Sequence, residues 1–136
     1  MTEFNLPGKE SDAFNRLDDF TQGYVEAAFF TDSNDPDDSQ EKLEFASFDQ
    51  LDSETITTMV ADCARFRAVL PNAARSEISE RQSEAGRDFW YTRNRHGVGY
   101  WDGDYPEIAA KQLEQESKRF REIRLVRGDN GEIYAE

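Results

Sequence analysis

The chain has 136 residues, of which 37% are hydrophobic and 12% are aromatic, and its formal net charge is −13. This length is typical of one domain, and ten Phe residues supply ring surface for a modest core. No apolar run is long enough to span a bilayer, and the start MTEFNLPGKESD lacks the pattern of a secretory signal. The single Cys excludes an intramolecular disulfide and favours a reducing cytoplasm.

The excess of negative over positive charge lies entirely in the first half of the chain. Residues 1–62 contain sixteen acids and three bases, whereas residues 63–136 contain thirteen of each. An anionic surface repels nucleic acid and anionic membranes and attracts basic surfaces, so direct binding to duplex DNA is disfavoured and a basic protein partner is favoured. The expected acidic surface consists of Asp18, Asp19, Glu26, Asp32, Asp35, Asp37, Asp38 and Glu41.

The first half of the chain predicts helices joined by polar segments. Residues 1–11 are expected to form a flexible arm, and apolar residues at helical spacing predict a helix over about 12–29. A polar loop around Pro36 follows, and then an irregular stretch whose Phe45, Phe48 and Leu51 are expected to anchor onto the core.

Two further helices are predicted before residue 87. An apolar stripe from Ile56 to Leu70 predicts a helix that begins near Ser53 and ends before Pro71. Asn72 can cap a third helix, AARSEISERQSEA, that Gly86 is expected to end.

The apolar period then changes to two, which predicts a β-hairpin. The segments DFWYTRN and GVGYWD are expected to be strands around an NRHG turn, with Tyr91 opposite Tyr100 and Trp90 opposite Trp101.

The chain is expected to close with a helix and a second hairpin. Asp104 is the predicted cap of a helix that has Pro106 in its first turn. The segments EIRLVRG and EIYAE are predicted to pair around GDNG, with Arg127 opposite Glu132 and Val126 opposite Ile133. The expected fold is therefore one α+β domain over residues 12–136, with about four helices and a small antiparallel sheet built from two C-terminal hairpins.

The first hairpin contains the most specialised side chains of the chain. The candidate binding residues are Trp90, Tyr91, Arg93, His96, Tyr100, Trp101 and Asp102. A catalytic His–Asp pair within this hairpin is disfavoured, because His96 and Asp102 lie at opposite ends of it. The favoured interpretation gives the rings to core and interface, with Arg93 stacked on a ring or paired with a carboxylate.

The sequence predicts no metal site, no cofactor and no catalytic nucleophile. The acidic stretch from Asp32 departs from a calcium loop at its Gly and Glu positions, and one Cys with one His does not make a zinc site. Cys63 lies within the apolar stripe, where it is expected to pack in the core.

The segments AGRDFWYTRNRHGVGYWD and GDNGEIYAE, together with GYVEAAFFTDSND and MVADCARF, resemble an uncharacterised family of small acidic phage and plasmid-borne proteins. The resemblance extends over about residues 20–135, although Arg87 and Arg95 stand where the family pattern has a His and a Gly. It implies a phage or mobile-element origin and a place in the bacterial cytoplasm, and it implies no activity.

Three functions follow as hypotheses. The first is a non-enzymatic interaction protein that binds a host or phage protein, in one version as a nucleic-acid mimic whose carboxylates replace phosphates. The second is a small enzyme or ligand-binding domain built around Arg93, His96 and Asp102. The third is a single-strand nucleic-acid binder that stacks bases on the aromatic hairpin. The sequence favours binding over catalysis and does not indicate an oligomeric state.

Overall fold

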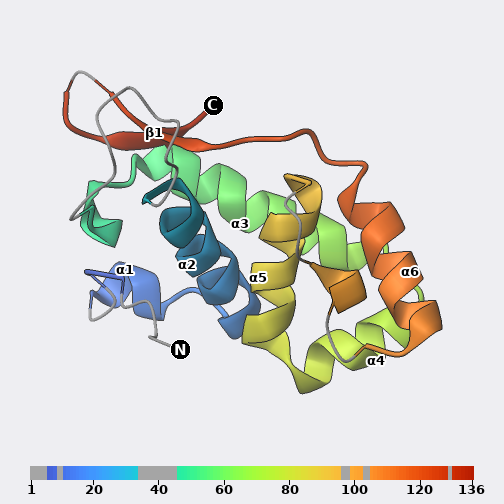
Figure 1. Cartoon of the computed structure of the whole chain (residues 1–136). Coiled ribbons are helices and arrows are strands. Elements are labelled where there is room, and N and C mark those ends of the chain that lie inside the picture. Colours follow the sequence, from blue (N-terminus) through green and yellow to red (C-terminus); the bar gives the residue numbers. More distant parts are fainter. Residues whose placement is uncertain (1–5, 9–10, 34–45, 96–98, 103–104, 129) are drawn as a thin grey trace.

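The computed structural model describes residues 6–8, 11–33, 46–95, 99–102, 105–128 and 130–136, apart from the side chains of residues 32, 33 and 102. Helices form most of the described structure, and a two-stranded antiparallel sheet lies at the C-terminal end (Figure 1). The helices are α1 (Asp12–Asn15), α2 (Asp19–Ser33), α3 (Ser53–Ala68), α4 (Asn72–Glu80), α5 (Gln82–Arg93) and α6 (Glu107–Ser117). Two 3-10 turns, η1 (Phe48–Gln50) and η2 (Tyr100–Asp102), and the strands β1 (Leu125–Arg127) and β2 (Ile133–Ala135) complete the described elements. The α+β class is confirmed.

Helices α2 and α5 cross with their backbones in contact, and two glycines make this contact possible. A Cβ atom placed on Gly86 would lie 1.8 Å from the carbonyl oxygen of Phe20, and one placed on Gly23 would lie 2.0 Å from that of Ser83. No side chain fits in that space, which explains the glycine at position 86. Gly86 lies inside α5, so the prediction that it ends a helix is wrong.

Aromatic rings fill the space beside this crossing. The Phe89 ring on α5 stacks on Phe66 of α3 at a centroid distance of 4.1 Å and on Tyr24 of α2 at 5.2 Å. Phe120, just after α6, meets Phe89 edge-on at 5.1 Å. Such pairs add about 0.5–1.5 kcal/mol each to the free energy of burial, so the rings join α2, α3, α5 and the C-terminal segment into one core.

The first predicted hairpin is wrong, because the segment DFWYTR belongs to α5. The buried residues of α5 are Ala85, Gly86, Phe89, Trp90, Thr92 and Arg93. Their spacing is that of one face of a helix, and packing of this face against α2 and α3 outweighs the β preference of adjacent aromatic residues. Of the second predicted strand, Tyr100 and Trp101 lie in η2. Residues 96–98, which include His96 and Gly97 of the predicted turn, are outside the described part of the chain.

Three boundaries in the helical part also differ from expectation. The predicted helix over 12–29 is divided into α1 and α2, and the predicted third helix ends at Glu80, with α5 beginning at Gln82. The arm predicted over 1–11 is wrong for residues 6–8, because Leu6 is buried in the core and the Pro7 carbonyl accepts a hydrogen bond from the Phe48 amide. The N-cap position of α6 is Pro106, and Asp104, the predicted cap, lies outside the described residues.

The second hairpin is confirmed, with a register that differs by one residue. Val126 pairs with Tyr134 and Arg127 with Ile133, because the Gly128 amide donates to the Glu132 carbonyl and leaves a three-residue turn. Gly131 in this turn has a φ of 85°, the left-handed conformation that three-residue hairpin loops require. The observed register directs Leu125 and Ile133 into the core, where the predicted one would have placed Val126 opposite Ile133.

The glycine contact between α2 and α5 can be tested with Gly86→Ala. Alanine normally stabilises a helix interior by about 1 kcal/mol relative to glycine. Here the added methyl group must separate two helices, so we expect the free energy of unfolding to fall by about 2–3 kcal/mol in urea denaturation. Gln82→Ala, at an exposed position of α5, is the control and should change stability by less than about 0.5 kcal/mol. A Gly86→Ala variant as stable as the wild type would show that the two backbones do not touch.

Candidate functional site

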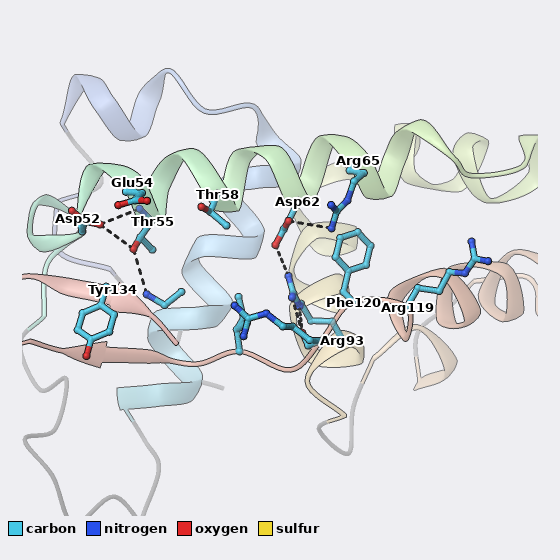
Figure 2. A pocket seen from close by; sticks show the side chains of 13 residues that line it. Asp52, Glu54, Thr55, Thr58, Asp62, Arg65, Arg93, Arg119, Phe120 and Tyr134 are labelled. Atoms are coloured by element: carbon cyan, nitrogen blue, oxygen red, sulfur yellow. Dashed lines mark hydrogen bonds and ion pairs between the residues drawn. The ribbon is translucent and has the colours of Figure 1, made fainter.

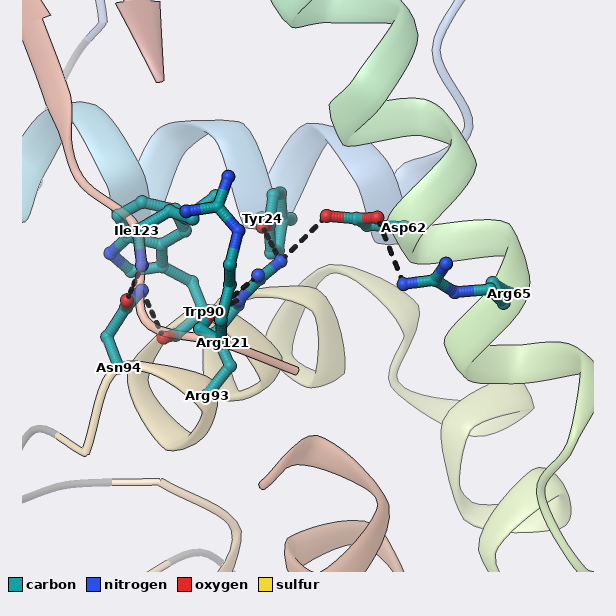
Figure 3. Close-up of polar contacts among 8 residues, drawn as sticks. All are labelled: Tyr24, Asp62, Arg65, Trp90, Arg93, Asn94, Arg121 and Ile123. Atoms are coloured by element: carbon teal, nitrogen blue, oxygen red, sulfur yellow. Dashed lines mark hydrogen bonds and ion pairs between the residues drawn. The ribbon is translucent and has the colours of Figure 1, made fainter. Parts of the chain in front are cut away.

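Arg93, the last residue of α5, is buried and links four segments of the chain (Figure 3). Its Nη1 donates to Asp62 Oδ2 on α3 at 2.9 Å and to Tyr24 Oη on α2 at 3.0 Å. Its Nε and Nη2 donate to the carbonyl oxygen of Arg121 at 3.0 and 2.6 Å. The expectation that Arg93 pairs with a carboxylate and stacks on a ring is confirmed, since its Cζ lies 5.2 Å from the centroid of Phe120.

Asn94 extends this link between α5 and the C-terminal segment. Its side-chain Nδ2 donates to the Trp90 carbonyl at 3.0 Å, and its Oδ1 accepts from the backbone amide of Ile123 at 2.7 Å. The segment that leads from α6 to β1 is therefore fixed to the end of α5 by hydrogen bonds between the side chains of Arg93 and Asn94 and the backbone groups of Arg121 and Ile123.

A groove of about 630 Å³ opens above the Arg93 guanidinium, between α3 and the C-terminal segment (Figure 2). Helix α3 supplies Thr55, Thr58, Asp62 and Arg65 to one side. The other side and the end near the hairpin are lined by Arg119, Phe120, Arg121, Ile123, Tyr134 and Ala135, with Asp52 and Glu54 at the start of α3. The volume lies within the range of about 300–1,000 Å³ that is usual for ligand sites.

The two ends of the groove carry opposite charge. Arg65 and Arg119 lie at the end near α6, and their side chains are 70% and 76% exposed. Arg121 also lines the groove, and its guanidinium lies on the side of Arg93 away from Arg65 (Figure 3). Asp52 and Glu54 lie at the other end (Figure 2). Within the described part of the chain, neither Arg121 nor Glu54 makes an ion pair, so both charges are available to an occupant.

Ring contacts hold the arginine end in place. The Arg65 guanidinium lies 4.8 Å from the centroid of Phe120 and pairs with Asp62 Oδ1 at 3.5 Å. The Arg93 guanidinium, at the floor of the groove, also lies close to the Phe120 ring. The ring therefore contacts both Arg93 at the floor and Arg65 at the rim. Cation–π contacts of this kind contribute about 0.5–1 kcal/mol at exposed sites and restrict the orientation of the side chain.

The residues predicted to form an aromatic binding surface are mostly in the core. Trp90 and Tyr100 are fully buried, and Tyr100 Oη donates to the Ala85 carbonyl at 2.7 Å. Tyr91 is half-buried, and Trp101 is 43% exposed with the Lys118 ammonium 5.9 Å from its ring. His96 and the Asp102 side chain lie outside the described residues. A stacking platform that includes Trp90 and Tyr100 is therefore wrong, because neither ring reaches the surface.

The predicted acidic surface is described only in part. Asp18 and Asp19 are exposed, and Asp18 pairs with Arg67 at 2.9 Å, which with the Thr21 hydrogen bonds lowers the pKa of its carboxyl despite partial burial. Glu26 is half-buried on α2, a helix whose described residues are mostly core. Asp19 and Glu26 are the acids among the described side chains of α2. Asp35, Asp37, Asp38, Glu41 and the Asp32 side chain lie outside the described residues.

A second polar cluster lies where α5 meets the start of α6. Tyr105 Oη donates to Asp88 Oδ2 at 2.8 Å, and the Arg81 guanidinium lies 4.8 Å from the Tyr105 ring. Burial raises the pKa of the Asp88 carboxyl to about 6, against the opposing effects of the Tyr105 hydrogen bond and of Arg87 and Arg81. Asp88 therefore titrates close to neutral pH.

The thiol of Cys63, which could otherwise react, is buried inside the protein. Burial raises the pKa of the Cys63 thiol well above its usual range, which keeps it protonated in the core. Among the described residues, no three His, Cys, Asp or Glu side chains lie close enough together to hold a metal ion. None of the helices in the described ranges combines the length and the apolar composition that crossing a bilayer requires.

Sequence reasoning identified Arg93 and missed the rest of the groove. Asp62 lies within α3 next to its apolar stripe, and nothing in the neighbouring sequence marks it as part of a site. Arg119 and Arg121 flank Phe120 in the sequence and resemble ordinary surface charges. Only the tertiary fold brings Asp62 and Arg121 together at Arg93, which lies 31 and 28 residues from them in the sequence.

Comparison with known proteins gives no match: no family model fits the chain, and no curated protein or solved structure is significantly similar to it.

The Arg93 network can be tested with Arg93→Lys. Lysine keeps the charge but cannot donate to Asp62, Tyr24 and the Arg121 carbonyl from one planar group. We expect the free energy of unfolding to fall by about 3–5 kcal/mol, the cost of disrupting a buried ion pair. Arg95→Lys is the matched control, because Arg95 forms an exposed pair with Glu122 at 3.1 Å, and it should change stability by less than about 0.5 kcal/mol. Equal effects of the two substitutions would contradict the role given to Arg93.

The Asp88 carboxyl predicts a defined pH dependence of stability. Its folded pKa of about 6 is above the ordinary value of 3.8, so the folded state holds this proton more tightly than the unfolded state. Ionisation of Asp88 therefore removes stability as the pH rises from about 4 to 6. Asp88→Asn should be more stable than the wild type, and its advantage should grow by about 1 kcal/mol between pH 5 and pH 7.5 in urea denaturation. Glu80→Gln, an exposed acid on α4, should show no such growth, and a constant Asp88→Asn difference would contradict the assignment.

Proposed function

We propose that this protein is a non-enzymatic interaction protein whose acidic N-terminal half binds a basic surface of a partner protein. The observation that carries the proposal is the separation of charge between the halves of the chain, with sixteen acids against three bases before residue 63.

The ion pairs of the folded chain support this proposal, because they leave much of that charge unneutralised. Among the described residues, Asp12, Asp19, Asp49 and Glu54 are exposed and make no ion pair. Arginine and lysine side chains of the second half pair mainly with acids of that same half. Such pairs join Arg81 to Glu77 and Glu84, Arg95 to Glu122, Lys118 to Glu114, Arg119 to Glu116, and Arg124 to Glu136.

The environment of Arg93 gives this residue a structural role and argues against a catalytic one. Its guanidinium makes four hydrogen bonds to groups of the protein itself, so it supports the fold instead of waiting for a substrate. The proposed partner is a host or phage protein with a basic surface, such as a nucleic-acid-binding protein. A phage or mobile-element origin and a bacterial cytoplasmic location are part of the proposal and rest on the resemblance of the sequence motifs.

The proposal predicts that partner capture depends on the acids of the first half. We expect the variant Asp12→Asn/Asp19→Asn/Asp49→Asn to retain about tenfold less of the captured partners from bacterial lysate than the wild type at low salt. High salt should reduce capture by the wild type and have a smaller effect on the variant. Quantitative mass spectrometry of the captured proteins gives the readout.

The control carries the same charge change in the second half. Glu80→Gln/Glu107→Gln/Glu132→Gln removes three exposed negative charges from the other half and should capture partners as the wild type does. If both triple variants lose capture equally, net charge alone governs binding and the proposed acidic surface is refuted.

A further inference from the structure

We propose that the groove between α3 and the C-terminal segment binds an extended peptide segment of the partner protein, with an acidic residue at one end and a basic residue at the other. This proposal rests on the proposed function, because it names the surface that would hold part of the partner.

The first argument is the lining of the groove. Most of its thirteen lining residues are charged or polar, and the main exposed ring is Tyr134, which is 39% exposed. Sites for small molecules are enclosed and predominantly apolar, whereas an open polar groove suits a chain that supplies its own hydrogen-bonding groups.

The second argument is charge complementarity. Arg65 and Arg119 attract carboxylates at one end, and Asp52 and Glu54 attract a lysine or arginine at the other (Figure 2). The acidic end and the net charge of −13 oppose a nucleic-acid backbone, which carries negative charge along its whole length. A peptide can present both signs, each in its own place.

The third argument is length. Asp52 and Arg65 are thirteen positions apart along α3, which corresponds to about 20 Å at 1.5 Å per residue. An extended chain advances about 3.3 Å per residue, so about six residues span the groove. The predicted ligand therefore has its acidic and basic residues four to six positions apart.

The fourth argument is that the floor is already formed. The Arg93 hydrogen bonds to Asp62 and to the Arg121 carbonyl fix both sides of the groove relative to each other. A preformed groove reduces the ordering that binding requires, which favours recognition of a short segment.

The experiment uses a phage-displayed random heptapeptide library selected on the full-length protein. We expect enriched peptides to contain an acidic and a basic residue four to six positions apart. Their synthetic, fluorescently labelled versions should bind the wild type in anisotropy measurements, and Thr58→Trp should weaken this binding at least tenfold by filling the groove. Thr57→Trp is the matched control, because Thr57 is exposed on α3 and does not line the groove.

Charge variants test the polarity of the groove. Arg121→Glu should weaken binding of the same peptides at least tenfold, whereas Lys111→Glu, an equal charge change on α6 outside the groove, should leave it within twofold. The exchange Glu54→Arg/Arg119→Glu keeps the net charge, reverses the charge at both ends and should abolish binding of peptides selected by the wild type. Absence of enrichment, or equal binding by Thr58→Trp and the wild type, overturns the groove assignment.

Failure here is distinguishable from failure of the proposed function. Asp12, Asp19 and Asp49 do not line the groove, so loss of partner capture in that triple variant with unchanged peptide binding separates the two surfaces. Partner capture that persists in Thr58→Trp without any peptide binding would leave the acidic surface as the binding surface and refute the groove.

Discussion

The guanidinium of Arg93 is the point at which α2, α3, α5 and the C-terminal segment meet. Burying a charge costs several kcal/mol, and here Asp62, the Tyr24 hydroxyl, the Arg121 carbonyl and the Phe120 ring offset that cost. Such a pair adds little net stability compared with an apolar core, but it tolerates only one arrangement of the groups around it. The position of the C-terminal segment, and with it the shape of the groove, follows from this requirement.

The glycine contact between α2 and α5 allows the groups around Arg93 to come within hydrogen-bond distance of it. Because Gly23 and Gly86 let the helix backbones touch, the Phe89 ring reaches both Tyr24 and Phe66, and Arg93 comes within hydrogen-bond distance of Tyr24. Wider separation of the helices would leave Arg93 buried without its partners, which is more costly than exposing it. Close helix packing and the buried ion pair therefore depend on each other.

The sequence predicts the parts of this fold that depend on local pattern. The stripe on α3 and the hairpin after residue 124 follow from the spacing of apolar residues and from the turn GDNG, and both are present. The segment from Asp88 to Arg93 was predicted as a strand because adjacent Phe, Trp and Tyr residues favour strands, and because Gly86 suggested a helix end. Positions 85, 86, 89, 90 and 93 are spaced as on one face of a helix. This spacing favours a helix over a strand only when Gly86 is recognised as a packing contact with α2 and not as a helix end. The groove has no local signal, because Asp62, Arg93 and Arg121 are brought together by tertiary contacts alone.

Charge acts at two distances in this molecule. At physiological ionic strength the Debye length is about 8 Å, whereas the ends of the groove are about 20 Å apart along α3. Asp52 and Glu54 therefore do not cancel the attraction that Arg65 and Arg119 exert on a carboxylate at the other end of the groove. A net charge of −13 guides a basic partner from afar, while contact with the groove requires the partner also to present an acidic residue. Long-range attraction alone would accept any basic protein, and the opposite polarity of the groove adds a second condition that most basic surfaces do not meet.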